Sequence, residues 1–294
     1  MVTELQKSIE HSIRVDQIPT LPAYVAQVSQ EMEREEVSIG RIADLISQDI
    51  GLAGRVLKLA NSPIYCRSTI ETVSVISAVQ RIGFAEMRNV CLSVGLSGHF
   101  EQNLEHFDIV ELWKHSLCVA FATQAIVPFC RSEVAGTLSL EMLHTAGLLH
   151  DIGLVVLARQ LPEQYRRIVE TCLNESRILW DVERDILGFD HAEAGSWVVS
   201  HWGLPDRLAQ IVQFHHDHDH ADEDISLYAK LIHVADIIAG MNGFGMGDAV
   251  PIRPFDVSAW VDLGLDDEAI PEIIEQTDRR IQTAELFAAL AQGN

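Results

Sequence analysis

Apolar residues recur at helical spacing along most of this 294-residue chain, and this period constrains the fold more than any other feature. The clearest stretch runs from Asp108, which can cap a helix, to Pro128, which discourages its continuation. Residues 140–149, 192–202 and 225–238 show the same period. No segment alternates apolar and polar residues as a half-buried strand does. The sequence therefore predicts an all-α protein, built as a multi-helix bundle.

The chain offers few places for a domain boundary. No internal repeat and no Pro/Ser-rich linker divides it, and the polar segment 98–108 is the best candidate. We therefore expect an N-terminal helical subdomain over residues 1–105 and a second helical subdomain over residues 106–294. A glycine-rich loop over residues 240–247 and an amphipathic helix over residues 270–290 should form the tail of the second subdomain.

Acidic residues outnumber basic ones by 43 to 21, which leaves a formal net charge of −22 with histidine neutral. Because clustered Lys and Arg are needed to neutralise phosphate groups, this balance disfavours direct binding of DNA or of an anionic membrane. No apolar run reaches about 18 residues, so no membrane-spanning helix is expected. The five cysteines are scattered and form no CxxC pair, which favours buried free thiols and a cytoplasmic location.

The sharpest motif is the His150-Asp151 pair, which ends an apolar helix and is followed by Gly153. An adjacent imidazole and carboxylate can ligate one metal ion, and the glycine should let the chain turn away. An HD dipeptide alone is common, yet more histidines lie at helix ends or on the long helix. These candidates are His115, His191, His215 and His216.

Two acidic residues lie at positions that suit a metal ligand. Asp236 falls inside the apolar helix 225–238, where an uncompensated carboxylate is costly to bury. A bound metal or a histidine partner would compensate the cost of burying this carboxylate, and His233 lies one turn earlier on the same helix. Alternatively, the carboxylate reaches solvent or caps a neighbouring helix. Glu111 and His115 form an i, i+4 pair that can approach one ion or form a solvated ion pair.

The remaining histidines are predicted to lie outside any site. His144 and His201 lack such partners and are expected to be ordinary helix residues. Most of the tract 215–224 should be an exposed loop, so we expect no role for His218 and His220. No GxSxG, HExxH or GxxxxGK[ST] motif occurs, so the corresponding hydrolase and nucleotide-binding classes have no support.

Several motifs together resemble the HDOD (HD-related output) domain over about residues 18 to 240. In the first half they are Leu21-Pro22, residues 42–49 (IADLISQD), 59–62 (LANS) and 78–83 (AVQRIG). In the second half they are residues 112–116 (LWKHS), 147–153 (GLLHDIG), 188–191 (GFDH) and 202–205 (WGLP). The resemblance implies an all-α bundle with an HD-domain-like C-terminal half, found in bacterial signal-transduction proteins and often lacking catalysis.

The same resemblance implies a set of ligands for one or more divalent metal ions, with Fe, Mn, Ni, Zn and Mg as the candidates. The HD-GYP phosphodiesterases, which cleave cyclic-di-GMP at clustered metals, have acidic and histidine residues in a matching order. The corresponding residues here are Glu111, His115, His150, Asp151, His191, His215, His216 and Asp236.

Two departures argue against that phosphodiesterase activity. After the HD motif those enzymes have a lysine, whose cation can meet a substrate phosphate, whereas this chain has Leu154. No GYP sequence follows His215-His216, and the loop there is short and acidic. An acidic loop beside the site should repel a dianionic nucleotide.

The sequence thus leads to three candidate functions. The first is a bacterial signal-transduction output or regulatory module with a His/Asp metal site and signalling proteins as partners. The alternative is a metal-dependent phosphohydrolase or phosphodiesterase acting on a nucleotide or another phosphoester, in which Asp151 would be catalytic. A third is a metal or redox sensor, since His and carboxylate ligands also suit iron.

Overall fold

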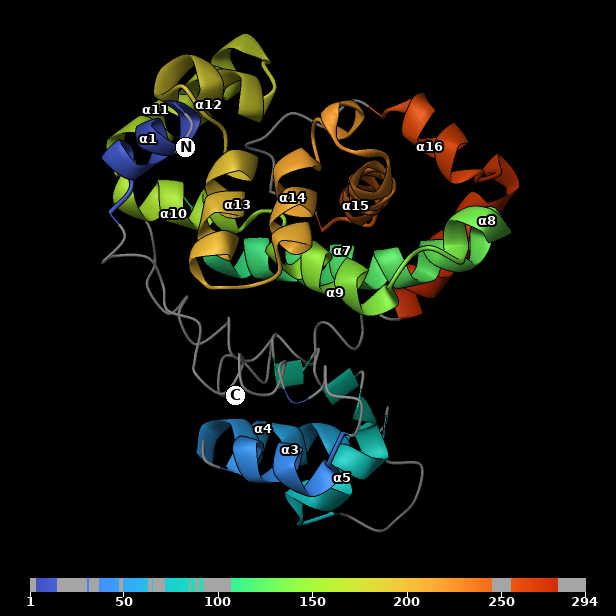
Figure 1. Ribbon diagram of the computed structural model, residues 1–294. Helices are drawn as coiled ribbons and strands as arrows, with labels where there is room; N and C mark the ends of the chain where they lie inside the picture. Colours follow the sequence, from blue (N-terminus) through green and yellow to red (C-terminus); the bar gives the residue numbers. More distant parts are fainter. Residues whose placement is uncertain are drawn as a thin grey trace. The chain divides into compact units, whose positions relative to one another are not determined.

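The computed structural model describes residues 4–14, 31, 37–47, 50–62, 65, 72–84, 86–87, 90–91, 107–244 and 255–279. Within these ranges the secondary structure is helical and contains no β-strand, which confirms the predicted all-α class. The chain divides into two compact units, one of residues 1–18 and 102–281 and the other of residues 19–101 and 282–294 (Figure 1).

The unit of residues 19–101 and 282–294 contains three described α-helices that pack on one another. They are α3 (Ile39–Ser47), α4 (Ile50–Ala60) and α5 (Val75–Ile82). The side chain of Asn61 donates to and accepts from the backbone of Thr72, with both bonds 2.8 Å long, and so ties the end of α4 to the segment before α5. Their apolar faces form the core of this unit, which includes Ile42, Ile46, Leu52, Val56, Leu59, Ala78 and Val79.

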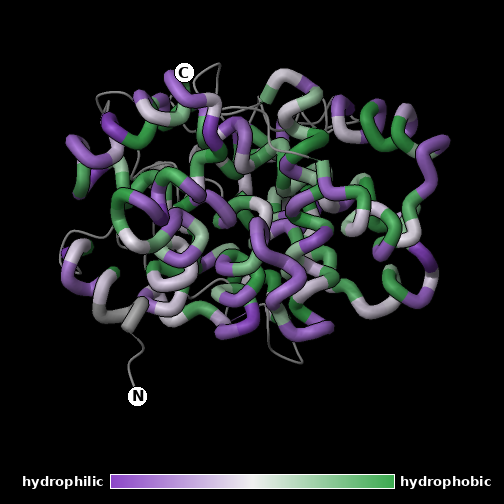
Figure 2. Tube along the Cα trace, turned by 90° about the horizontal axis from the view of Figure 1, so that it is seen from above, coloured by the Kyte–Doolittle hydropathy of each residue, from purple (hydrophilic) through white to green (hydrophobic). Residues whose placement is uncertain are grey.

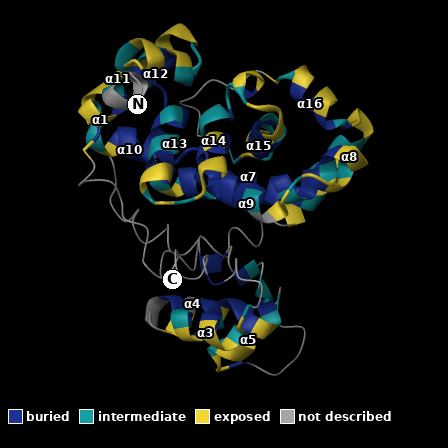
Figure 3. Ribbon diagram, viewed as in Figure 1, coloured by how far each residue is buried: buried dark blue, intermediate teal, exposed yellow. Residues whose placement is uncertain are grey.

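The other unit is built around two long buried helices, α7 (Ile109–Ile126) and α15 (Glu223–Met241), which pack against each other. Asp108 caps α7 as predicted, because its side chain accepts hydrogen bonds from the backbone N–H groups of Val110 and Glu111. Most residues of both helices are buried, which Figure 3 shows in dark blue. Green and purple segments alternate along much of the described chain in Figure 2, as helices with one buried face require.

Six further helices complete the frame around these two. They are α9 (Leu140–Leu149), α10 (Ile152–Gln160), α11 (Pro162–Glu175), α12 (Leu179–Leu187), α13 (His191–His201) and α14 (Asp206–Phe214). Helix α9 packs on α7, α13 packs on both α10 and α14, and α1 (Glu4–Ser12) contacts α13. Short elements fill the connections: η2 (Val127–Phe129), α8 (Ser132–Ala135) and η3 (His218–His220).

Gly153 has a different role from the one predicted. The chain turns at Asp151, and Gly153 lies inside the first turn of α10. A Cβ atom at Gly153 would lie 1.9 Å from the carbonyl oxygen of His191 and 2.8 Å from the backbone nitrogen of Gly195. The prediction that this glycine turns the chain away is therefore wrong. It allows α10 and α13 to approach closely, which positions His191 beside Asp151.

The C-terminal part of this unit is only partly described. Helix α15 continues to Met241, into the predicted loop, and Gly243 follows with a φ of 80°. Beyond residues 245–254, which lie outside the described ranges, come α16 (Val257–Leu263) and η4 (Asp267–Ala269). Residues 270–279 are helical, and the rest of the predicted helix 270–290 lies outside the described residues. No helix in the described ranges is both long enough and apolar enough to cross a membrane.

Candidate metal centre

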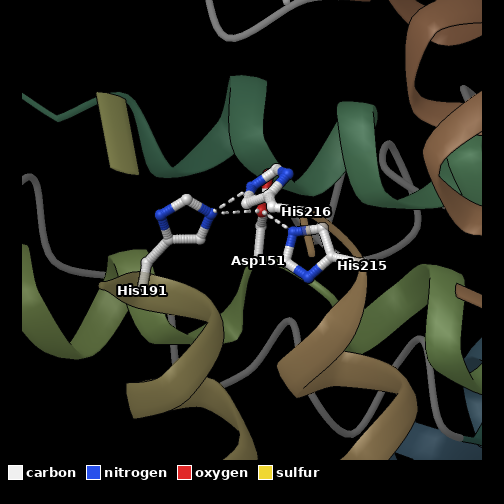
Figure 4. Close-up of side chains that lie close together, drawn as sticks. All are labelled: Asp151, His191, His215 and His216. Atoms are coloured by element: carbon white, nitrogen blue, oxygen red, sulfur yellow. Dashed lines mark hydrogen bonds and ion pairs between the residues drawn. The ribbon is translucent and has the colours of Figure 1, made fainter. Parts of the chain in front are cut away.

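Asp151 lies at the centre of a fully buried cluster of histidines. Its Oδ1 atom is 3.3 Å from Nε2 of His191 and 3.5 Å from Nε2 of His215. Its Oδ2 atom is 3.1 Å from Nε2 of His150 and 3.6 Å from Nε2 of His115. In Figure 4 the rings of His191 and His215 point toward Asp151 from different helices. The two carboxylate oxygens of one aspartate therefore face two separate pairs of imidazoles.

Six helices bring these side chains together. His191 begins α13, where Asp190 and Glu193 form a capping box that holds the start of the helix. His215 and His216 follow the last residue of α14, and Nε2 of His216 lies 2.8 Å from Nε2 of His191. The other ligand candidates come from α7, the α9–α10 turn and α15. The site is thus a product of tertiary packing and not of one local motif.

The candidate ligands around Asp151 form two groups, in each of which the ligand atoms lie within 4.8 Å of one another, and His218, Asp219 and Asp256 form a third such group. The first group is Asp151, His191, His215 and His216. The second is His115, His150 and Asp236, in which Nε2 of His115 is 3.1 Å from Oδ1 of Asp236. The two groups meet at Asp151, whose Oδ2 atom faces His115 and His150.

Backbone carbonyls fix the tautomer of three of these histidines. Nδ1 of His115 lies 2.6 Å from the carbonyl oxygen of Phe244, and Nδ1 of His215 lies 2.6 Å from that of Val212. His150 makes the same contact with Gly147 at 2.8 Å. A carbonyl oxygen only accepts, so each Nδ1 carries a proton, and in the neutral form of each ring the Nε2 lone pair faces a carboxylate.

A lone pair that faces a carboxylate oxygen at about 3 Å is repelled by it, and a cation between the two makes the arrangement favourable. The cluster therefore fits a bound cation. Imidazole nitrogens together with carboxylate oxygens are the ligands that Fe, Mn, Ni and Zn accept, whereas Mg²⁺ prefers oxygen ligands. The residues present thus fit a transition metal better than they fit Mg²⁺.

Glu183, on α12, supports His191 from behind the cluster. Its Oε2 atom lies 2.6 Å from Nδ1 of His191 and accepts a second bond, 2.9 Å long, from the backbone N–H of His191. Burial alone would lower the pKa of His191, but the Glu183 and Asp151 carboxylates raise it to about 10. Burial raises the pKa of Glu183, with His191 acting in the opposite direction. Such a carboxylate–histidine pair orients a ligand and increases its basicity.

His215 differs from His191 because its Nδ1 atom faces a backbone carbonyl and not a carboxylate. Burial among other imidazoles, chiefly His150, lowers the pKa of His215 to about 4, although Asp151 opposes this effect. The ring is therefore neutral at physiological pH, which is the protonation state that a metal ligand requires.

Seven of the eight residues predicted from the sequence fall in the two groups. Glu111 lies in neither, and its carboxylate pairs with Nζ of Lys114 at 2.8 Å near the start of α7. His144 is buried beside Gln124 and His201 stacks on Trp197, so both lie outside the two groups.

The predicted exposed loop after His216 is partly wrong. His218 is buried, begins η3 and lies between two carboxylates, with Nδ1 3.3 Å from Oδ1 of Asp219 and Nε2 3.2 Å from Oδ2 of Asp256. His233, predicted to support Asp236, places its ring against that of His218, with centroids 5.3 Å apart. His220 is exposed and pairs with Asp217, as a loop residue would.

Two residues near the centre were missed from the sequence, and both lie on α12. Glu183 occupies the apolar face of this helix, one turn after Leu179, and Trp180 stacks on His216 with ring centroids 4.0 Å apart. A carboxylate on an apolar helix face is the signal that singled out Asp236. It would have found Glu183 had α12 been recognised as a helix.

The fold and the site define an all-helical protein with a buried histidine and aspartate centre of the HD type. Its sequence matches the HDOD domain over residues 18–218, and the chain belongs to the HDOD family. A curated relative, an uncharacterized protein of Treponema pallidum (strain Nichols), is 28% identical over 225 residues. The aligned region is 76% of this chain and 42% of that protein, so the chain spans less than half the length of this relative.

Solved structures share the fold over nearly the whole chain. An HDOD domain protein of unknown function from Geobacter sulfurreducens is 25% identical, with a TM-score of 0.76 over 97% of this chain and 96% of that one. A candidate signal transduction protein from Marinobacter aquaeolei VT8 is 20% identical (TM-score 0.76, 98% of this chain, 65% of that one). A candidate phosphohydrolase from Shewanella amazonensis SB2B is 22% identical (TM-score 0.73, 97% and 98%). The last two likenesses show a common fold alone.

Proposed function

We propose that this chain is a bacterial signal-transduction output module whose folded state is stabilised by a divalent transition-metal centre at Asp151, and that it does not turn over phosphoesters. The observation that carries the proposal is the arrangement of imidazole Nε2 atoms around both carboxylate oxygens of Asp151. His191, His215 and His216 would hold one ion together with Asp151, and His115, His150 and Asp236 would hold a second together with the same aspartate. The output would pass to signalling proteins that bind the helical surface, and a cytoplasmic location accords with the buried thiols.

The metal would act mainly on structure in this proposal. A bound ion supplies a positive charge that joins side chains from six helices, and a ligand that binds only the folded chain stabilises it. The protein's own part is to orient the rings, through the three carbonyls and through Glu183.

Two observations support the absence of phosphoester turnover. Leu154, at the position where the related phosphodiesterases have a lysine, is fully buried inside α10 and offers no cation to a phosphate. The opening beside His216 is lined by the carboxylates of Asp217, Asp219 and Asp256, which repel a phosphate dianion. Transition-state charge on a phosphoryl group would therefore lack stabilisation from these side chains.

The alternative function is a metal-dependent phosphohydrolase, and the convergence of seven ligand candidates favours it. A metal ion lowers the pKa of a bound water, which is the chemistry such an enzyme needs. Asp151 would then be catalytic, and the substrate would be a nucleotide or another phosphoester. The same ligands also suit an iron-based redox sensor.

Elemental analysis of the protein purified without added ions tests the proposal. We expect a stoichiometric transition metal in the native chain and in the control His201→Ala, and loss of the metal in Asp151→Asn, which keeps the side-chain shape. No turnover of cyclic-di-GMP or p-nitrophenyl phosphate is expected with Mn or Fe present. Efficient turnover that Asp151→Asn abolishes would establish the alternative, and absence of metal under every loading condition would refute the metal centre.

A further inference from the structure

A pocket of about 340 Å³ opens beside the candidate metal centre, on the outer side of His216. It is formed between α12, η3, α15 and the residues that precede α16, and its lining includes Trp180, His216, His218 and Phe255. Its volume lies in the range of small-molecule sites. Because His216 lines the pocket and also belongs to the Asp151 group, the pocket adjoins the centre directly.

Two aromatic side chains provide the apolar part of the lining. Trp180 stacks on His216, with ring centroids 4.0 Å apart and an angle of 19° between the planes. The ring of Phe255 packs against that of Trp260, with ring centroids 5.8 Å apart, and 46% of the surface of Phe255 is exposed. Indole and phenyl faces carry negative charge density, so they attract cations.

Carboxylates supply the polar part of the lining. Oδ1 of Asp256 accepts a 2.7 Å bond from the backbone N–H of Ser258, while its Oδ2 faces His218. Asp219 also faces His218, and Nζ of Lys230 lies 3.2 Å from its Oδ1 atom. The hydrogen bond from Lys230 lowers the pKa of Asp219, and that from Ser258 lowers the pKa of Asp256 against the opposing effect of burial.

The charge of this lining is one-sided. Asp217, Asp219 and Asp256 contribute three carboxylates, His216, His218 and His233 contribute imidazoles, and none of the described residues that line the pocket is Lys or Arg. An anionic ligand would therefore be repelled. His218, Asp219 and Asp256 would offer three ligand atoms to an inorganic cation. Such a cation is disfavoured, because Lys230 already bonds Asp219 and because Trp180 and Phe255 offer no ligand atoms to a metal.

We propose that this pocket binds a small organic cation, with its ammonium group among the carboxylates of Asp217, Asp219 and Asp256 and its apolar body against Trp180 and Phe255. The proposal deepens the proposed signalling function by naming the chemistry of an input, because the pocket shares His216 with the metal centre. Binding itself depends only on the pocket residues. It is therefore expected in protein stripped of metal as well as in loaded protein.

A charge series on one molecular frame tests this proposal. Benzylammonium, benzyl alcohol and benzoate differ chiefly in charge, and their binding to the full chain can be measured by isothermal titration calorimetry after treatment with a chelator. We expect saturable binding of benzylammonium that is at least about tenfold tighter than that of benzyl alcohol, and no binding of benzoate.

Substitutions in the lining test whether benzylammonium binds in this pocket. Asp256→Asn keeps the helix cap, since asparagine caps as well as aspartate, but removes one charge. Asp266→Asn is its matched control, because Asp266 caps η4 in the same way and does not line the pocket. Asp256→Asn and Trp180→Leu should each weaken benzylammonium binding by a factor on the order of three to ten, while Asp266→Asn leaves it unchanged. Circular dichroism checks that each variant is folded.

Three results would overturn the proposal: benzoate or benzyl alcohol binding as tightly as benzylammonium, equal weakening in Asp266→Asn, or displacement of benzylammonium by Mg²⁺ at constant ionic strength. The last result would mark a site for inorganic cations. Because these titrations use metal-free protein, they separate this proposal from the metal centre. Loss of metal in Asp151→Asn with intact benzylammonium binding would support both.

Discussion

The Nδ1 atom of His191 lies 2.6 Å from the Oε2 atom of Glu183, and both side chains are fully buried. Because the opposite side of the same ring points at Asp151, Glu183 determines how His191 is presented to the centre. A carboxylate behind a histidine ligand restrains the ring and raises its basicity.

Glu183→Gln should therefore weaken metal binding by about 10- to 100-fold, because the amide can still occupy the space but no longer supplies the charge. Competition with a chelator of known affinity measures the effect. Asp185→Asn, on the same helix but paired with Arg177 at the surface, is the control and should bind metal as the native chain does. Equal affinities for Glu183→Gln and Asp185→Asn would contradict the role of Glu183.

Gly153→Ala should destabilise the unit that holds the centre. The added methyl group would lie 1.9 Å from the carbonyl oxygen of His191, so α10 and α13 would have to move apart, at a cost of about 1–3 kcal/mol or more. Gly240→Ala is the matched control, because Gly240 is helical and nothing lies within 4 Å of its Cβ position. That change should be stabilising by about 0.5–1 kcal/mol.

Denaturant unfolding of both glycine variants measures these differences, and elemental analysis shows whether Gly153→Ala also loses metal. A free energy of unfolding that is unchanged in Gly153→Ala would mean that the two helices separate at no cost. The close approach would then not be what holds His191 beside Asp151.

The comparison of Asp236 with Glu183 shows how far the sequence can predict the site. Asp236 interrupts a long apolar helix, so the cost of burying its charge is evident from the apolar residues on either side of it. Glu183 follows the same logic, because Leu179, Val182 and Ile186 recur at helical spacing in α12, but the segment 179–187 was not recognised as a helix in the sequence. Because this helix was not recognised, its buried carboxylate was missed with it.

Other features of the centre depend on packing that no local pattern records. The contact of Gly153 with His191 exists only because α10 and α13 cross there, and the stacking of Trp180 on His216 joins two helices distant in sequence. His218 is buried because Asp256, from a distant part of the chain, packs over it. The sequence predicts the ligand types in this family, whereas tertiary packing decides which of them meet.

The described cysteines should resist alkylation in the native protein. Burial raises the pKa of Cys91 and Cys118 to about 12 and that of Cys130 and Cys172 to about 11, so at a pH of about 8 these thiols are protonated and unreactive. Iodoacetamide treatment before and after unfolding, followed by peptide mass spectrometry, checks each site. Rapid native-state labelling of any of the four would show that its surroundings open readily. Cys66 lies outside the described residues.

Removal of the metal should lower the thermal stability of the protein. A ligand that binds only the folded state contributes about 2.7 kcal/mol when its free concentration is about one hundred times its Kd. For a unit of this size each kcal/mol corresponds to about 2–4 °C in Tm, so chelation should lower Tm by roughly 5–10 °C. Differential scanning calorimetry with and without chelator measures the shift. Asp151→Asn should show no further shift on chelation, because its site has already lost the ion. The contradicting result is an unchanged Tm of the native chain after elemental analysis has shown that the chelator removed the metal. It would mean that the ion contributes no stability. The imidazoles would then be held in place by their carbonyl and carboxylate partners alone.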